Sequence, residues 1–308
     1  MTKGNKAVFI IGVVCSALPW ATPPLALCLG IAFGLLWENP WSELSATASR
    51  LLLQAAVVGL GFGLPISEVI AVGKHSFFST LVGILCTIGS GYLLGKMLRI
   101  PKTTGMLVAC GTAICGGSAI AAIAPVLKAK NDEAAVALAT VFTLNAVALL
   151  TFPMLGHYLG LGQHQFGVWA GMAIHDTSSV VGAAASYGQQ ALDTATTVKL
   201  TRALWIVPVA LVTGMLANAN QGVKVPRFII LFIVAALLHS AIPAWQPLWQ
   251  GLSTLAHGAL VVSLFFVGSG LNRGLLKRVG LPTFAQGTIL WVLVSGATLL
   301  ALKQGVLG

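Results

Sequence analysis

Long apolar runs alternate with short polar breaks from one end of this chain to the other. The breaks carry proline, glycine or charge, as in Trp-Ala-Thr-Pro-Pro at residues 20–24 and Arg-Ile-Pro-Lys-Thr-Thr at residues 99–104. Apolar runs of this length and frequency predict membrane helices. The runs cover approximately residues 7–20, 25–37, 50–66, 76–98, 103–128, 132–158, 165–187, 196–217, 226–241, 251–271 and 281–302.

The composition favours the same class of protein. Of the 308 residues, 57% are hydrophobic and 8% are charged, whereas soluble proteins carry about 25% charged residues. We therefore predict an all-α polytopic membrane protein, a single unit over residues 1–308 with about 9–11 transmembrane helices. The start is basic and then apolar, like a signal peptide, but it lacks a small-x-small cleavage site before Pro23 and Pro24. Residues 1–24 are therefore interpreted as an extra N-terminal helix.

The positive charge of the chain does not indicate a nucleic-acid partner. The net charge is +10, but the 17 basic residues cluster at segment ends, where they act as topology signals. The cysteines indicate neither a zinc site nor a disulfide framework. They lie inside apolar segments rather than in loops, and they do not have the spacing of a zinc motif. These cysteines are Cys15, Cys28, Cys86, Cys110 and Cys115.

Two apolar segments, 103–128 and 165–187, are interrupted near their middle by glycine and small polar residues. Each half has about 11 to 13 residues, which corresponds to roughly 18 Å of helix. That length covers about half of a bilayer. We expect both segments to be re-entrant, entering and leaving on one side of the membrane. Two broken helices that span the membrane are the alternative.

Two pairs of stretches resemble each other and predict structural repeats. GTAICGGSAIAAIA from Gly111 aligns with GMAIHDTSSVVGAA from Gly171, and residues 59–73 align with residues 266–280 at glycine, leucine and valine positions. We predict repeat one over residues 25–160 and repeat two over residues 161–308. With re-entrant segments the matched elements point in opposite directions. The repeats are then inverted, and the two broken segments meet near the midplane.

The basic residues predict the orientation of the chain. With two re-entrant segments, most of them fall on one side, and Lys74 and Lys303 fall on the other. An excess of Lys and Arg marks the cytoplasmic side, so we expect a cytoplasmic N-terminus. The residues on that side are Lys3, Lys6, Arg50, Lys96, Arg99, Lys102, Lys128, Lys130, Lys224, Arg227, Arg273, Lys277 and Arg278.

A helix that breaks inside a membrane leaves backbone N–H and C=O groups that hydrocarbon cannot satisfy. The N-terminal ends of the half-helices carry free donors and partial positive charge, so they suit an anion. We place these ends around Gly116–Ser118 and Thr177–Ser179. Two such breaks in inverted repeats are typical of a transport site.

Asp176 is the one acidic residue deep in an apolar segment, and its neighbour is His175. A carboxylate there costs about 2.5 kcal/mol or more, so it marks a functional site by default. We expect Asp176 to couple transport to H⁺ or Na⁺. His175 is a second coupling candidate, and Asn145, in the segment 132–158, is a lesser one. The alternatives are an Asp176 that caps a helix and a His175 bonded to a free carbonyl.

Other residues near the breaks are candidates for binding the substrate. The set is Thr112, Cys115, Gly116, Gly117, Ser118, His175, Thr177, Ser178, Ser179 and Arg202. Instead of binding substrate, the hydroxyl groups could mediate helix–helix contacts. Cys115 could be a small packed residue. Lys199 and Arg202 either snorkel to the interface or supply a fixed positive charge that pairs with Asp176 or an anion. No cofactor or metal is expected apart from the coupling H⁺ or Na⁺.

The stretches CGTAICGGSAIAAIAPVLKAK and KLTRAL, with a His-acid motif between them, resemble the sulfate exporter (YeiH-like) family of bacterial inner-membrane proteins. The likeness runs from about residue 25 to the C-terminus. Members often carry His-Glu-Val-Ala-Gln where residues 175–179 read His-Asp-Thr-Ser-Ser, so the acid is kept and the polar set that follows differs. The resemblance implies a relationship to bile-acid-type secondary carriers, a location in the bacterial inner (plasma) membrane, and efflux of sulfate or a sulfonate.

We expect a secondary transporter of a small inorganic or organic anion that works by alternating access. Its partners are the lipid bilayer and the anion, with no nucleic acid, and a homodimer stays open. A channel is the first rival, because broken helices also build pores. An intramembrane enzyme that uses Cys115 or Ser178 with His175 is the second, although a second acid to orient the histidine is missing. We expect no enzymatic activity.

Overall fold

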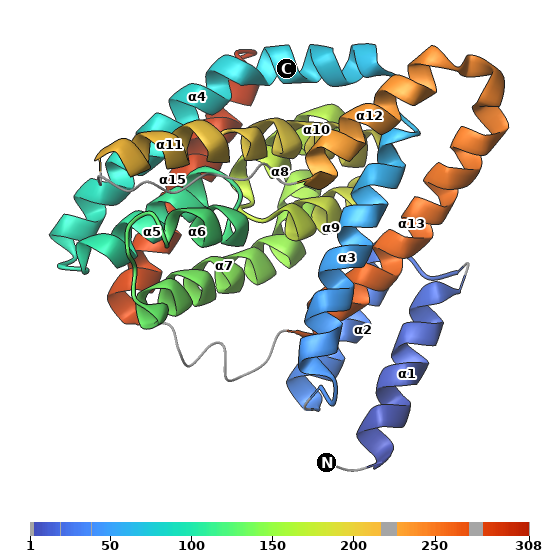
Figure 1. Cartoon of the computed structure of the whole chain (residues 1–308), viewed down its shortest axis with the longest axis horizontal. Coiled ribbons are helices and arrows are strands. Elements are labelled where there is room, and N and C mark those ends of the chain that lie inside the picture. Colours follow the sequence, from blue (N-terminus) through green and yellow to red (C-terminus); the bar gives the residue numbers. More distant parts are fainter. Residues whose placement is uncertain (1–2, 19, 38, 217–226, 271–279, 308) are drawn as a thin grey trace. The chain divides into compact units, whose positions relative to one another are not determined.

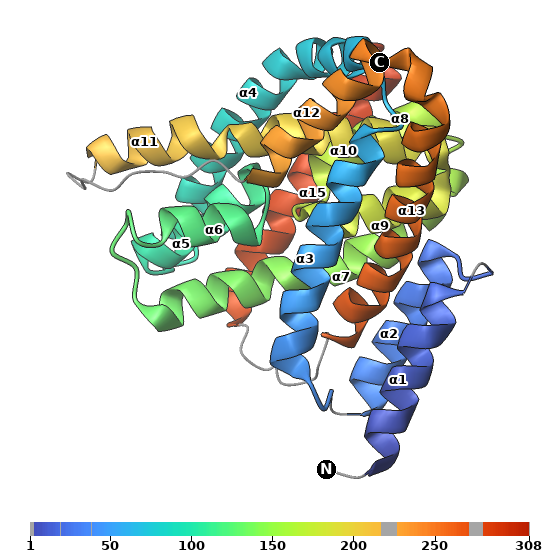
Figure 2. The ribbon, with the colours of Figure 1, turned by 45° about the vertical axis from the view of Figure 1, so that its right-hand side comes forward.

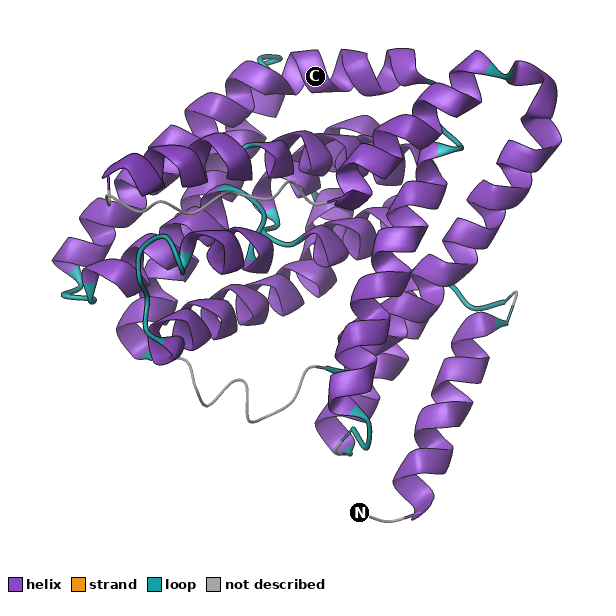
Figure 3. Cartoon of the chain, in the orientation of Figure 1, coloured by secondary structure: helices purple, strands orange, loops and turns teal. Residues whose placement is uncertain are grey.

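The computed structural model describes residues 3–18, 20–37, 39–216, 227–270 and 280–307. Figure 1 and Figure 2 show the ribbon in two views, and Figure 3 shows that the described part is built of helices and loops. The helices are α1 (Lys3–Ala17), α2 (Pro23–Leu36), α3 (Ser42–Gly61), α4 (Ile66–Met97), α5 (Lys102–Ala113), α6 (Gly117–Ile123), α7 (Asn131–Tyr158), α8 (Gln163–Ala173), α9 (Thr177–Tyr187), α10 (Gln189–Leu204), α11 (Ile206–Leu216), α12 (Arg227–Ala241), the 3₁₀ turn η1 (Pro243–Trp245), α13 (Gln246–Ser269) and α15 (Leu281–Lys303).

Length and hydropathy confirm the predicted all-α polytopic membrane class. Five described helices are long and apolar enough to cross a membrane, since about 20 apolar residues suffice. They lie at Ser42–Gly61, Phe77–Met97, Asp132–Tyr158, Pro243–Ser269 and Leu281–Lys303. Further apolar helices are shorter, among them Leu25–Gly34 and Arg227–Ala241.

The chain forms two compact units, and each takes residues from both predicted repeats. The first unit contains Met1–Ala71 and Pro226–Arg273, and the second contains Val72–Val225 and Gly274–Gly308. The repeat boundaries at residues 25, 160 and 308 stay a prediction.

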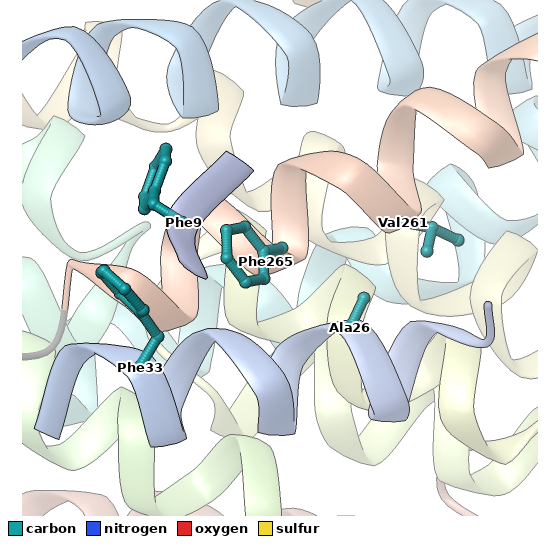
Figure 4. Close-up of a cluster of buried hydrophobic side chains, with 5 residues drawn as sticks. All are labelled: Phe9, Ala26, Phe33, Val261 and Phe265. Atoms are coloured by element: carbon teal, nitrogen blue, oxygen red, sulfur yellow. The ribbon is translucent and has the colours of Figure 1, made fainter. Parts of the chain in front are cut away.

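The first unit is held together by α13, which packs along α2 and α3, with α12 on α3 and α1 on α13. Figure 2 shows α1 and α2 side by side. Its aromatic core joins Phe9, Phe33 and Phe265, with the Phe9 and Phe265 ring centroids 5.5 Å apart. Figure 4 shows these rings together with Ala26 and Val261, which line the same cluster. Edge-to-face ring contacts of this kind add to the burial of apolar area.

The second unit contains both broken segments. Helix α10 packs against α8 and α9, α5 packs against α7, and α15 contacts α5, α7 and α8. The buried amide of Gln286 on α15 donates from Nε2 to the carbonyls of Gly91 and Gly105, which ties α15 to α4 and α5. A buried side-chain donor satisfied in this way favours a single arrangement of the three helices.

The predicted breaks are confirmed at the predicted residues. Helix α5 ends at Ala113 and α6 begins at Gly117, and α8 ends at Ala173 and α9 begins at Thr177. The half-helix N-terminal ends therefore lie at Gly116–Ser118 and Thr177–Ser179, as the small polar residues indicated. Glycine and short polar residues favour such interruptions, because they permit backbone conformations outside the helix.

Both broken segments fold back on themselves. In the first, the Ile120 side chain lies against Gly111, where an added Cβ would be 2.9 Å from Ile120 Cδ1. These residues are nine positions apart, about 13.5 Å along a straight helix, so α6 lies beside α5. In the second, the ring of Tyr187 at the end of α9 stacks on Phe166 near the start of α8, with centroids 3.8 Å apart. Two hairpins of this kind favour the re-entrant interpretation over broken spanning helices.

Several predicted segment boundaries are wrong. The run 196–217 is not one helix: α10 begins at Gln189, and Trp205 separates it from α11. Helices α3, α4 and α13 begin at Ser42, Ile66 and Gln246, five to ten residues before the predicted runs at 50, 76 and 251. The first turn of α3 is polar and those of α4 and α13 mix polar and apolar residues, so hydropathy detects only the later, continuously apolar turns. The predictions for Lys224, Arg273, Lys277, Arg278 and residues 271–279 of the second alignment lie outside the described residues.

Candidate functional site

The loops of the two hairpins meet within the second unit. Gly116, the residue before α6, has φ +65°, and a Cβ added there would lie 3.4 Å from both Cα and Cβ of Asp176. The same Cβ would lie 3.3 Å from Cγ1 of Val141 on α7. Position 116 requires glycine for two reasons. A positive φ angle favours glycine, and the two loops approach so closely that a side chain would press on Asp176 and Val141. The convergence predicted for the two breaks is therefore present.

Arg202 of α10 bonds to the C-terminal end of the first helix in each hairpin, α5 and α8. Its Nε donates to the carbonyl of Ala113 at 2.6 Å and its Nη2 to that of Thr112 at 3.1 Å, both on α5. Its Nη1 donates to the carbonyl of Met172 on α8. The last carbonyls of a helix lack intrahelical donors and carry partial negative charge. One buried guanidinium thus satisfies the C-terminal ends of both α5 and α8.

Lys199, three residues earlier on α10, donates a further hydrogen bond at the C-terminal end of α8. Its Nζ donates to the carbonyl of Ile174 at 2.6 Å, and the residue is completely buried. Helix α10 can come this close because α8 presents glycine to it: a Cβ at Gly171 would lie 3.1 Å from the carbonyl oxygen of Ala195. Residues three apart on a helix are neighbours on its surface, so both cations reach the breaks from one helix.

Asp176 caps α9. Its Oδ2 accepts hydrogen bonds from the backbone N–H of Ser178 at 3.1 Å and of Ser179 at 3.4 Å. The N–H groups of His175 and Asp176 in turn donate to Oδ1 of Asn145, at 3.1 and 3.3 Å. The capping alternative for Asp176 is confirmed, and coupling stays a prediction. Asn145 of α7 holds the loop in place.

Several buried polar atoms around the breaks have no partner within the described part of the chain. They are both ring nitrogens of His175, Nδ2 of Asn145 and the hydroxyl groups of Thr112 and Thr196. Native proteins pair nearly all such atoms, and each unpaired one costs about 1–3 kcal/mol. The alternative in which His175 bonds to a free carbonyl is therefore wrong, since its ring has no such contact. Unpaired buried groups of this kind are candidates for contact with a ligand or with water.

The remaining predicted residues lie around the same point with different exposure. Cys115 and Ser179 are buried, whereas Gly117, Thr177 and Ser178 are half-buried. Ser118 is exposed, so its side chain is turned away from the buried group. The interface alternative for Arg202 and Lys199 is wrong, because these residues are 2% and 0% exposed. Arg202 directs its bonded donors at carbonyls rather than at Asp176.

Sequence patterns do not reveal three parts of this arrangement. The first is the direct bond from Lys199 to the second loop, although a lysine in an apolar segment is itself a signal of a functional residue. The carbonyl acceptors of Thr112, Ala113, Met172 and Ile174 could not be found, because any residue type supplies a carbonyl. Thr196, one turn before Lys199, was missed for lack of a distinguishing pattern.

Basic and acidic side chains from two elements gather at the breaks. Lys199 and Arg202 bring two buried basic side chains to the breaks, and Asp176 brings a half-buried carboxyl group. The helix ends that accept from the cations offset part of their charge but carry no full negative charge.

The sequence of the chain is similar to a family of known membrane proteins. The family described as "Conserved hypothetical protein 698" matches residues 7–286. A UPF0324 membrane protein of Geobacter sulfurreducens is 53% identical over 299 residues, which cover 97% of this chain and 96% of the relative. Relatives with the same family name occur in Bacteroides thetaiotaomicron, at 45% identity over 91% of this chain and 86% of the relative, and in Bdellovibrio bacteriovorus, at 45% over 99% and 96%. No solved structure matches the chain.

Proposed function

The chain belongs to the Conserved hypothetical protein 698 family of membrane proteins, and from this premise we propose that it is a secondary transporter of a small anion. The observation that carries the proposal is the meeting of two folded-back half-helix pairs around two buried cations. Converging broken helices in a membrane are typical of transporters, because irregular backbone is tolerated where it lines a binding site.

The charges and the unpaired atoms support an anion rather than a cation as substrate. Lys199 and Arg202 disfavour a cation at the breaks except where the Asp176 carboxylate holds it directly, and the unpaired hydroxyl groups and one ring N–H of His175 can donate to an oxyanion. The substrate would contact Thr112, His175 and the backbone around Gly116 and Thr177. Sulfate and sulfonates are the substrates that the sequence resemblance implies, as is a relationship to bile-acid-type carriers.

Coupling to H⁺ or Na⁺ is part of the proposal. Asp176 would carry the coupling cation, with His175 and Asn145 beside it. Its Oδ1 atom suits that role, because the two hydrogen bonds that cap α9 both go to Oδ2. Alternating access would expose the breaks first to one side of the membrane and then to the other.

The proposal extends to the location and assembly of the protein. We place the chain in the bacterial inner membrane with a cytoplasmic N-terminus, on the distribution of basic residues in the sequence. The mass of the detergent-solubilised protein measures whether the chain forms a homodimer.

Uptake by proteoliposomes tests the function. The full chain is reconstituted, and entry of radiolabelled sulfate is followed with and without unlabelled sulfate inside the vesicles. A carrier gives a saturable rate and faster entry when the inside holds exchangeable anion. Entry that rises linearly with concentration and ignores the internal anion would contradict a carrier and support a channel.

A further inference from the structure

The first unit carries an apolar groove of its own. Helices α3, α12 and α13 line it, and both α12 and α13 pack on α3 (Figure 1). Its volume is about 580 Å³, within the roughly 300–1,000 Å³ of typical ligand pockets. The described residues that line it are Leu, Val, Ala, Gly and Phe, with two polar exceptions, Gln54 and Arg227. The groove therefore suits an apolar ligand with one polar end.

The groove follows α3 for about three turns. Its lining residues on α3 run from Leu51 to Phe62, eleven positions that correspond to about 17 Å of helix. The ring of Phe62 stacks on that of Trp249 on α13, with the centroids 5.2 Å apart, so an aromatic pair stands at this end. One leaflet of a bilayer contains about 15 Å of hydrocarbon, half of the core. The groove thus has the length of one lipid chain in one leaflet.

Large apolar side chains along the groove are exposed. Leu51, Leu231 and Leu255 are each more than half exposed. Two of the three helices belong to spans that are long and apolar enough to cross a membrane, Ser42–Gly61 and Pro243–Ser269. An exposed apolar surface of this size marks an interaction site. At membrane depth its natural occupant is hydrocarbon.

Two arginines lie at the end of the groove opposite Phe62. On α12, the His239 ring contacts the carbonyl of Phe62 at 2.6 Å, and Arg227 lies twelve residues earlier, about 18 Å along the helix. Arg227 lines the groove directly. On α3, Arg50 lies four residues before the lining residue Gln54, so the two share one stripe of the helix. The polar end of the groove is therefore basic.

These arginines have no counter-charge among the described residues. Both are exposed, and neither forms an ion pair there. Residues 226–273 contain no Asp or Glu, and the one acid of α3, Glu43, lies seven positions before Arg50. Arg50 also lies inside the candidate span Ser42–Gly61, where an arginine normally pairs with another group. A phosphate suits both arginines, because a guanidinium binds it through two parallel hydrogen bonds.

We propose that the groove binds an anionic phospholipid, with one acyl chain along α3 and the phosphate held by Arg50 and Arg227. A headgroup of net negative charge satisfies both arginines, whereas a zwitterionic headgroup brings its own cation beside them. Both arginines are predicted on the cytoplasmic side, so the lipid belongs to the cytoplasmic leaflet. The inference goes beyond the proposed function and does not depend on it.

Native mass spectrometry of the full-length protein, purified in detergent and stripped of lipid, tests the proposal. The probes are phosphatidylglycerol and phosphatidylcholine with the same acyl chains, which differ in net charge. One measurement gives the number of lipids bound to each chain and the oligomeric state. We expect one phosphatidylglycerol for each chain, bound at least tenfold more tightly than phosphatidylcholine.

Two kinds of variant separate the headgroup from the acyl chain. The double variant Arg50→Gln, Arg227→Gln should lower the affinity for phosphatidylglycerol to that for phosphatidylcholine. The control pair Lys96→Gln, Lys102→Gln removes two exposed charges predicted on the same side of the membrane, and it should leave both affinities unchanged. Ala55→Trp fills the groove from an exposed lining position and keeps both arginines, so the affinity for phosphatidylglycerol should fall at least tenfold.

Leu237→Trp is the matched control for Ala55→Trp, because Leu237 is an exposed residue of α12 that does not line the groove. Equal binding of the two lipids by the unaltered protein, or an equal loss in the lysine pair, overturns the phosphate site. Binding of phosphatidylglycerol that survives Ala55→Trp overturns the acyl-chain site. A dimer that Ala55→Trp converts to a monomer, with lipid binding unchanged, assigns the groove to a second copy of the chain and overturns the proposal.

Discussion

Arg202 donates a hydrogen bond to the carbonyl of Ala113, 89 positions earlier in the chain, while the same guanidinium holds the carbonyl of Met172. These bonds hold the C-terminal ends of α5 and α8 against each other through one side chain. It also explains why a permanent charge is kept inside an apolar unit, because helix C-terminal ends attract cations. A guanidinium suits the position better than an ammonium, since its donors form a planar fork.

Replacing Arg202 should therefore destabilise the second unit. Arg202→Ala leaves three buried carbonyls without their donor, and we expect the free energy of unfolding to fall by about 3 kcal/mol or more. Arg202→Lys keeps the charge and loses the fork, so an intermediate loss is expected. Thermal melting in detergent measures both. Lys303→Ala, at the exposed end of α15, is the matched control, and an equal loss there would contradict the role given to Arg202.

Gly116→Ala should weaken the contact between the loops. Alanine at φ +65° is strained, and its Cβ would press on Asp176 and Val141, so a loss of about 1–3 kcal/mol is expected. Gly160 has φ +66° and no neighbour within 4 Å, which makes Gly160→Ala the control for strain alone. Melting and sulfate uptake are compared in the two variants. If Gly160→Ala is as damaging to uptake, the close approach of the loops is not the cause.

Asn145 supports the second loop through its side-chain oxygen. Asn145→Leu removes the acceptor for the N–H groups of His175 and Asp176, and we expect a loss of about 2 kcal/mol in stability. Asn145→Asp keeps the acceptor and should retain more of the stability, at the expense of a second carboxylate beside Asp176. Amide hydrogen exchange at residues 175 and 176 gives the readout. Unchanged protection in Asn145→Leu would mean that the bonds to Asn145 do not hold the loop.

Cys115 distinguishes a carrier from an enzyme. The residue is buried at the first break, and as a small packed side chain it should tolerate alanine with a loss of about 1 kcal/mol. We expect Cys115→Ala to transport sulfate at close to the original rate. A variant that folds normally and has lost all function would favour the nucleophile that the enzyme alternative requires.

The sequence predicted the helical class, the two breaks and the residues next to them. Glycine and polar side chains inside apolar runs are rare enough to be read directly, which is why Gly116 and Asp176 were found. The helix starts at Ser42 and Ile66 could not be read from hydropathy, because a first turn that is polar, or that mixes polar and apolar residues, looks like a loop. The bonds of Lys199 and Arg202 could not be predicted, since their acceptors are backbone carbonyls brought together by the fold.

The melting temperature of the purified protein across a panel of anions tests the central claim most directly. The panel holds sulfate, sulfite, thiosulfate, taurine-like sulfonates and dicarboxylates, each with and without Na⁺ and at two pH values. A ligand that binds the folded state raises the melting temperature by mass action. We predict a saturable rise with at least one of these anions, lost in Lys199→Gln. No rise with any anion, in a protein that melts cooperatively, would contradict an anion site at the helix breaks.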